Sequence, residues 1–116
     1  MEPGKRSVMA EGTALFRAAH QLIDDDPKIL LDPLALAVVG TSAEEIQADR
    51  ERLLRPYSIQ MRTLTVMRSR YTEDELTAST SRGVTQYVVL GAGLDTSPYR
   101  SGHTAEHLRT FEIDHP

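Results

Sequence analysis

The sequence predicts an α/β fold in which a helical segment precedes a parallel strand unit. Apolar residues recur at helical spacing over residues 8–81, interrupted by prolines and glycines. After Gly83 the pattern changes to short runs of β-branched and aromatic residues at 84–90 and 110–113. The first run is apolar on both faces, which indicates a buried parallel strand. Because a connection of this length between neighbouring strands requires a crossover, we expect the two strands to run parallel.

The first helix is expected over residues 8–23, where it ends at an acidic run that leads into Pro27. The residues before it have little to bury, and we expect residues 1–7 to be a disordered terminus. A short helix is expected over residues 33–39, because Asp32 can accept the free amides of a first turn. The apolar positions that predict the first helix are Val8, Leu15, Ala18, Ala19, Leu22 and Ile23.

Ser42 and Glu45 have the spacing of a capping box and predict a further helix, which ends at Pro56. A last helix is expected from residue 57 to 70, and residues 73–81 continue or resume it before the stop at Gly83. Residues 8–82 therefore form a helical part, and residues 83–116 begin a strand unit.

The carboxyl ends of the two predicted strands should meet at one edge of the sheet. A turn of Gly91, Ala92 and Gly93 follows the first strand, and Asp114 follows the second, 23 residues after Gly91. Glycines allow a sharp turn and a close approach to a ligand, and a carboxylate at the next strand end can accept both hydroxyls of a ribose. Glu112 shares the face of Asp114 and stays open as an alternative.

Position 96, where a dinucleotide fingerprint has its third glycine, is a threonine. Thr96 therefore argues against NAD and FAD, and the strand, turn and acidic strand end favour S-adenosyl-L-methionine. An NAD-dependent oxidoreductase is the less favoured alternative. An ordinary turn with a solvated strand end would also fit the spacing.

Several motifs together resemble a known family. They are Leu90-Gly-Ala-Gly-Leu-Asp-Thr96 with Tyr99-Arg100, Phe111-Glu-Ile-Asp-His-Pro116, and upstream Asp32-Pro33-Leu34-Ala35 and Arg68-Ser-Arg70. Over residues 8–116 the chain resembles the amino-terminal part of the leucine carboxyl methyltransferase-like family of S-adenosyl-L-methionine-dependent methyltransferases.

That resemblance implies a Rossmann-like class I methyltransferase sheet of seven strands, preceded by a helical cap. Residues 8–82 would be the cap, and residues 83–116 would be the first two strands of an incomplete, truncated cofactor domain. It also implies that Arg70 pairs with the methionine carboxylate of the cofactor. Gly91, Ala92 and Gly93 would lie beneath the methionine portion, and Asp114 would bind the ribose.

The resemblance implies methyl transfer to an oxygen of a small-molecule or peptide acceptor, a carboxylate or a hydroxyl. No catalytic residue can be named from it. The alternative is a truncated, non-catalytic fragment or paralogue that binds cofactor weakly, or that self-associates through the unpaired edge of its sheet.

Charge and composition exclude several other classes. The formal net charge is −4 with scattered basic residues, which argues against a nucleic-acid partner. The absence of cysteine excludes disulfides and thiolate metal sites. No apolar run approaches the roughly 18 residues of a membrane span, and no secretory signal is apparent. We therefore expect a cytoplasmic protein.

Overall fold

The computed structural model describes residues 7–100 and 107–115, and it is an α/β structure, as predicted. The predicted disordered terminus lies outside the described residues except for Ser7, which precedes the first helix. In chain order the elements are α1 (Val8–Ile23), α2 (Ala35–Val39), α3 (Ala43–Ala48), α4 (Arg50–Leu53), α5 (Pro56–Ser81), β1 (Gln86–Leu90), α6 (Ser97–Arg100) and β2 (Arg109–Ile113).

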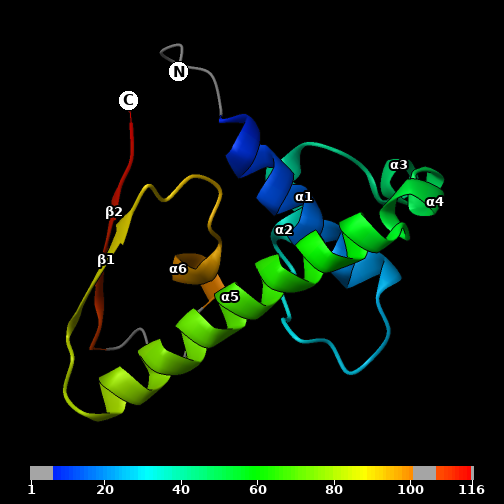
Figure 1. Ribbon diagram of the computed structural model, residues 1–116. Coiled ribbons are helices and arrows are strands. Elements are labelled where there is room, and N and C mark those ends of the chain that lie inside the picture. Colours follow the sequence, from blue (N-terminus) through cyan, green and yellow to red (C-terminus); the bar gives the residue numbers. More distant parts are fainter. Residues whose placement is uncertain (1–6, 101–106, 116) are drawn as a thin grey trace.

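The long helix α5 connects two parts of the molecule (Figure 1). Its first half packs with α4 and crosses α1, and its second half leads to the two strands, with α6 between helix and strands. The helices α1 to α4 share a small apolar core built around alanines of α1, which let α2 approach closely. Its fully or nearly fully buried members are Ala18, Ala19, Ile23, Ala35, Ile46 and Leu53.

Most predicted helix boundaries are confirmed. The first helix has the predicted bounds, Ser42 and Glu45 form the capping box, and α2 and α5 end shortly before Gly40 and Gly83. The predicted helix between Ser42 and Pro56 is divided at Asp49 into α3 and α4. The two segments predicted at 57–70 and 73–81 form one continuous helix.

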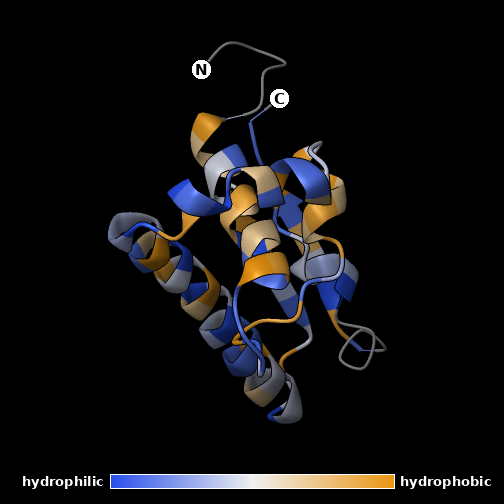
Figure 2. Ribbon diagram, turned by 90° about the vertical axis from the view of Figure 1, so that its right-hand side faces the viewer, coloured by the Kyte–Doolittle hydropathy of each residue, from blue (hydrophilic) through white to orange (hydrophobic). Residues whose placement is uncertain are grey.

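The buried side of α5 differs from an ordinary apolar helix face. Its buried residues are Ser58, Arg62 and Val66, which recur every four residues. Apolar residues of the same helix, such as Leu64 and Met67, are exposed instead. Figure 2 accordingly shows hydrophilic and hydrophobic residues mixed along the whole helix. The helix is therefore docked through a polar contact as well as through apolar packing.

That polar contact joins Arg62 to Asp24, at the end of α1. The Arg62 Nε and Nη2 atoms each donate to the carboxylate over 2.8 Å, and Nη1 donates to the carbonyl of Leu53 over 2.7 Å. His20 Nδ1 lies 2.7 Å from the same carboxylate. Partial burial would raise the pKa of Asp24, but the hydrogen bonds with Arg62 and His20 outweigh it and lower that pKa.

The two strands pair in parallel, as predicted, with Val88 opposite Phe111 and Leu90 opposite Ile113. The prediction that the first strand is buried is wrong. Val88 is 50% and Leu90 76% exposed, because no helix within the described residues covers the sheet face on which they lie. The opposite face is turned toward α6, where the hydroxyl of Tyr99 donates to Glu112 over 2.8 Å. Self-association through the sheet edge stays a prediction.

We expect Asp24→Asn to lower the free energy of unfolding by about 3 kcal/mol at neutral pH, because it leaves the buried guanidinium of Arg62 uncompensated. This loss of free energy is at the low end for a buried ion pair because the Asp24 side chain is 29% exposed. The pKa of Asp24 is lowered in the folded state, so its contribution is complete above the unfolded value near 4 and is lost as pH falls further.

Urea unfolding of the parent and of Asp24→Asn between pH 7 and pH 3 measures this difference. The gap between the two proteins should narrow below about pH 4. Asp49→Asn is the matched control, since Asp49 pairs with Arg52 on the exposed surface and its loss should cost little. A gap that stays constant down to pH 3, or an equal cost for both variants, would contradict the assignment.

Candidate cofactor site

The glycine turn, residues 91–93, leaves β1 at the edge where β2 ends. The amide of Gly91 donates to the carbonyl of Ile113 over 2.7 Å, and the amide of Ala92 points to the same oxygen at 3.4 Å. Gly91 has φ of 65° and Gly93 has φ of 52°, values in the left-handed region. Glycine adopts this region without steric cost, so both positions require it.

Asp114 lies beside the glycine turn, as the sequence predicts. Its Oδ2 atom accepts from the amide of Gly93 over 2.6 Å, and its Oδ1 atom accepts from the amide of His115 over 2.7 Å. The hydrogen bonds from His115 and Gly93 hold the pKa of Asp114 below its ordinary value. The carboxylate is therefore ionised at neutral pH, and each oxygen keeps a lone pair for another donor.

Glu112 is engaged differently from Asp114. It lies two residues earlier on β2, where its Oε2 atom accepts from Tyr99 of α6. This hydrogen bond, together with the negative charge of Glu112, raises the pKa of the Tyr99 hydroxyl. Glu112 thus contacts α6 and Asp114 contacts the turn.

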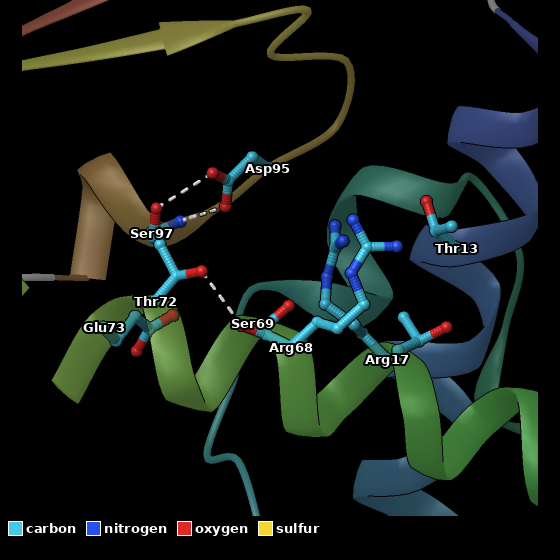
Figure 3. Close-up of a pocket in the computed structure, with 9 residues that line it drawn as sticks. Thr13, Arg17, Arg68, Ser69, Thr72, Glu73, Asp95 and Ser97 are labelled. Atoms are coloured by element: carbon cyan, nitrogen blue, oxygen red, sulfur yellow. Dashed lines mark hydrogen bonds between the residues drawn. The ribbon is translucent and has the colours of Figure 1, made fainter. Parts of the chain in front are cut away.

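A cavity of about 250 Å³ opens next to the turn, between α1, α5 and the start of α6 (Figure 3). Its lining is polar and contains both signs of charge. The lining residues are Thr13, Arg17, Thr65, Arg68, Ser69, Thr72, Glu73, Asp95 and Ser97. Two of them, Asp95 and Ser97, belong to the segment that leads from the glycine turn into α6, so the cavity adjoins the exit of the turn.

Two arginines of the cavity have unused hydrogen-bond donors. Arg17 is buried and donates from Nη2 to the carbonyl of Leu94; its Nε makes no hydrogen bond within the described part of the chain but lies 3.5 Å from the carboxylate of Asp32. The guanidinium of Arg68 makes no hydrogen bond or ion pair with any residue at 7–100 or 107–115. Both side chains extend into the cavity from facing helices (Figure 3). The arrangement suits an anionic group.

Arg70, which the family resemblance pairs with the cofactor carboxylate, does not line the cavity. Its Nε lies 2.9 Å from Asp74 one turn along α5, and its Nη1 donates to the carbonyl of Ile29 over 3.0 Å. The structure therefore brings together Gly91, Ala92, Gly93 and Asp114, and places Arg70 elsewhere. Sequence reasoning missed Arg17 and Arg68 as cavity residues.

The described residues contain neither a candidate metal site nor a candidate membrane span. No group of three or more histidine, aspartate or glutamate side chains there is placed to hold a metal ion. Within the same ranges, no helix combines the length and the apolar character that crossing a bilayer requires.

Gly93 also packs against α1, which yields a testable prediction. A Cβ atom at position 93 would lie 3.1 Å from the Cβ of Ala10, whereas one at Gly91 would meet nothing within 4 Å. We expect Gly91→Ala to cost about 1 kcal/mol of unfolding free energy through its positive φ. Gly93→Ala should cost more, because contact with Ala10 adds to the same backbone strain.

A double-mutant cycle with Ala10→Gly separates the cost of the positive φ from the cost of the contact with the Ala10 Cβ. In the Ala10→Gly background the cost of Gly93→Ala should shrink, and the cost of Gly91→Ala should not change. Chemical denaturation provides the free energies. Equal costs of Gly93→Ala in the two backgrounds would show that α1 does not constrain the turn.

Comparison with known proteins identifies the family. The family model described as leucine carboxyl methyltransferase matches residues 10–116. A Bacillus subtilis protein, "Putative S-adenosyl-L-methionine-dependent methyltransferase YktD", is 40% identical over 75 residues, which cover 64% of this chain and 25% of the relative.

Two further relatives carry the same description. The one from Streptomyces coelicolor is 31% identical over 100% of this chain and 41% of its own length. The one from Parafrankia sp. is 34% identical over 92% of this chain and 34% of its own length. The chain thus spans well under half the length of these curated relatives, and it belongs to the leucine carboxyl methyltransferase family.

Proposed function

We propose that the chain binds S-adenosyl-L-methionine at the glycine turn and the adjoining cavity, and that it serves methyl transfer to an oxygen acceptor. The observation that carries the proposal is the contact between Gly93 and Asp114, close in the chain to Asp95, which lines the cavity. An ionised carboxylate and a close-approach turn thus lie at one edge of the sheet, and the chain that leaves the turn enters the lining of a cavity that also contains two arginines. The related proteins named as S-adenosyl-L-methionine-dependent methyltransferases support the choice of cofactor.

The ribose of the cofactor would lie against Asp114. Its carboxylate is exposed and ionised, and its two oxygens keep acceptor capacity beyond their bonds to Gly93 and His115. Glu112 is the less suitable acceptor because Tyr99 already donates to it. The glycines leave room for the ligand to approach the backbone of the turn.

The methionine end of the cofactor would enter the cavity, where its carboxylate needs a cationic partner. Arg68 lines the cavity, and its guanidinium has no partner at residues 7–100 or 107–115; Arg17 lies in the same lining and adds positive charge. A guanidinium and a carboxylate match in geometry and charge. We assign the carboxylate to Arg68, in place of Arg70, because Arg70 is paired with Asp74 outside the cavity.

The cofactor would supply an electrophilic methyl group on a positively charged sulfur. The residues of this chain would bind and orient it, which accounts for a large part of catalysis when the acceptor is already nucleophilic. A carboxylate acceptor requires no base, and the name of the family points to a carboxyl acceptor. A hydroxyl acceptor would require a base in addition.

Calorimetric titration of the purified chain with S-adenosyl-L-methionine, S-adenosylhomocysteine and NAD tests the proposal. We expect saturable binding of the two adenosyl amino acids and none of NAD. Asp114→Ala should raise the dissociation constant roughly ten- to a hundredfold, because it removes a charged acceptor from the ribose. Glu112→Gln is the matched control and should bind like the parent.

The outcomes separate the alternatives. A folded chain that binds none of the three ligands would favour the non-catalytic alternative, and selective binding of NAD would favour the oxidoreductase. Loss of affinity in Glu112→Gln but not in Asp114→Ala would reverse the ribose assignment.

The two arginines of α5 provide a second matched pair. Arg68→Gln should raise the dissociation constant for S-adenosyl-L-methionine by roughly ten- to a hundredfold, since a charge-assisted hydrogen bond to the carboxylate is lost. Arg70→Gln should bind as tightly as the parent. Titration with methylthioadenosine, which lacks the amino-acid end, should give the same affinity for all three proteins. A larger loss in Arg70→Gln than in Arg68→Gln would restore the original assignment.

A further inference from the structure

The carboxylate of Asp32 is completely buried, with a side-chain exposure of 0%. It precedes α2, where its Oδ1 atom accepts from the amide of Leu34 over 3.1 Å. An ionised carboxylate in such a place is costly unless charges and hydrogen bonds compensate it. Two guanidinium groups do so: Arg17 Nε lies 3.5 Å from Oδ2, and Arg100 Nε lies 3.2 Å from Oδ1.

The shortest contact of this carboxylate is with Thr96, 64 residues later in the chain. The hydroxyl of Thr96 donates to Asp32 Oδ2 over 2.6 Å and accepts from Arg100 Nε over 2.8 Å. Thr96 is 1% exposed. Both hydrogen-bonding capacities of the hydroxyl are therefore used inside the protein, three residues after the glycine turn.

Arg17 contacts the backbone of Leu94, the residue that follows the glycine turn. Its Nη2 donates to the carbonyl of Leu94, so one side chain of α1 bridges Asp32 and the backbone just after Gly93. On the other side, Arg100 pairs with Glu73 of α5 and donates to the carbonyl of Leu31 over 3.2 Å. Two arginines and two carboxylates thus balance in charge in a network that joins α1 and α5 to α6 and to the residue before it, Thr96.

The glycine turn is consequently fixed at both ends. Its entry is held by β1 and by the hydrogen bonds of Gly91 and Gly93 to the end of β2. Its exit is attached to the helical part by side chains, through Leu94 and Thr96, and Asp95 adds local hydrogen bonds with Ala92 and Ser97. Without the attachment to the helical part, only the local hydrogen bonds of Gly93 and Asp95 would restrain the path of residues 93–96 from the strand to α6.

We propose that Thr96 is a positioning residue for the cofactor turn: its hydroxyl fastens the exit of the turn to the buried carboxylate of Asp32 in the helical part. Thr96 does not touch the ligand in this proposal, which rests on the proposed function only in naming the turn as the cofactor site. It explains why a hydroxyl side chain occupies the position of the third glycine in a dinucleotide fingerprint. Only serine could replace its donor and acceptor roles at similar size.

Thr96→Val tests the proposal, because it keeps the shape and removes the hydroxyl. Amide hydrogen exchange of the ligand-free chain should accelerate about tenfold at Gly93 and Asp95, and the dissociation constant for S-adenosyl-L-methionine should rise about tenfold. Thr96→Ser should restore both values. Asp24→Asn, which breaks the other buried ion pair away from the turn, should leave exchange at these amides and the affinity unchanged under conditions where it stays folded.

Unchanged exchange at Gly93 and Asp95 in Thr96→Val would overturn the proposal, as would failure of Thr96→Ser to restore them. Equal effects of Asp24→Asn would also overturn it, because they would show a general loss of stability. If the parent chain does not bind S-adenosyl-L-methionine, the proposed function fails, and the exchange comparison alone still decides whether Thr96 anchors the turn.

Discussion

The structure depends on the compensation of one buried charge, the carboxylate of Asp32. Burial of an ion costs several kcal/mol unless partners replace its hydration, so the carboxylate constrains whatever surrounds it. Arg17 comes from α1, Thr96 follows the glycine turn, and Arg100 ends α6. The helical part and the strand part can therefore reach their native contact only when all of these side chains meet at one point.

A second ion pair, between Asp24 and Arg62, docks α5 onto the end of α1 in the same manner. Such pairs matter here because the apolar core is small and its central members are alanines, which contribute little buried area each. Because hydrogen-bonded ion pairs require particular distances and angles, they fix the relative position of two helices more narrowly than apolar contacts do. The resulting scaffold places the glycine turn and Asp114 at one edge of the sheet, and it places Arg17 and Arg68 in the cavity that Asp95 and Ser97 also line.

Local patterns predicted much of this fold, because capping and turn preferences act over a few residues. The helix from Val8 to Ile23, the capping box of Ser42 and the parallel strands all follow from such patterns. Burial of β1 could not be predicted, since it depends on what covers the sheet. The assignment of Arg70 rests on the family resemblance alone, whereas the helical period places residues two apart on nearly opposite sides of α5, and Asp74, one turn after Arg70, is a partner within the helix. Arg68 instead shares its face with Thr65 and Thr72, which also line the cavity.

The most direct test of the central claim is a map of amide chemical-shift changes in the isotopically labelled chain during titration with S-adenosylhomocysteine. The account predicts changes at the glycine turn, at Asp114 and along the cavity faces of α1 and α5, with α3 and α4 unaffected. Changes confined to α3 and α4, or a saturating ligand that leaves Gly91 and Gly93 unperturbed, would contradict it.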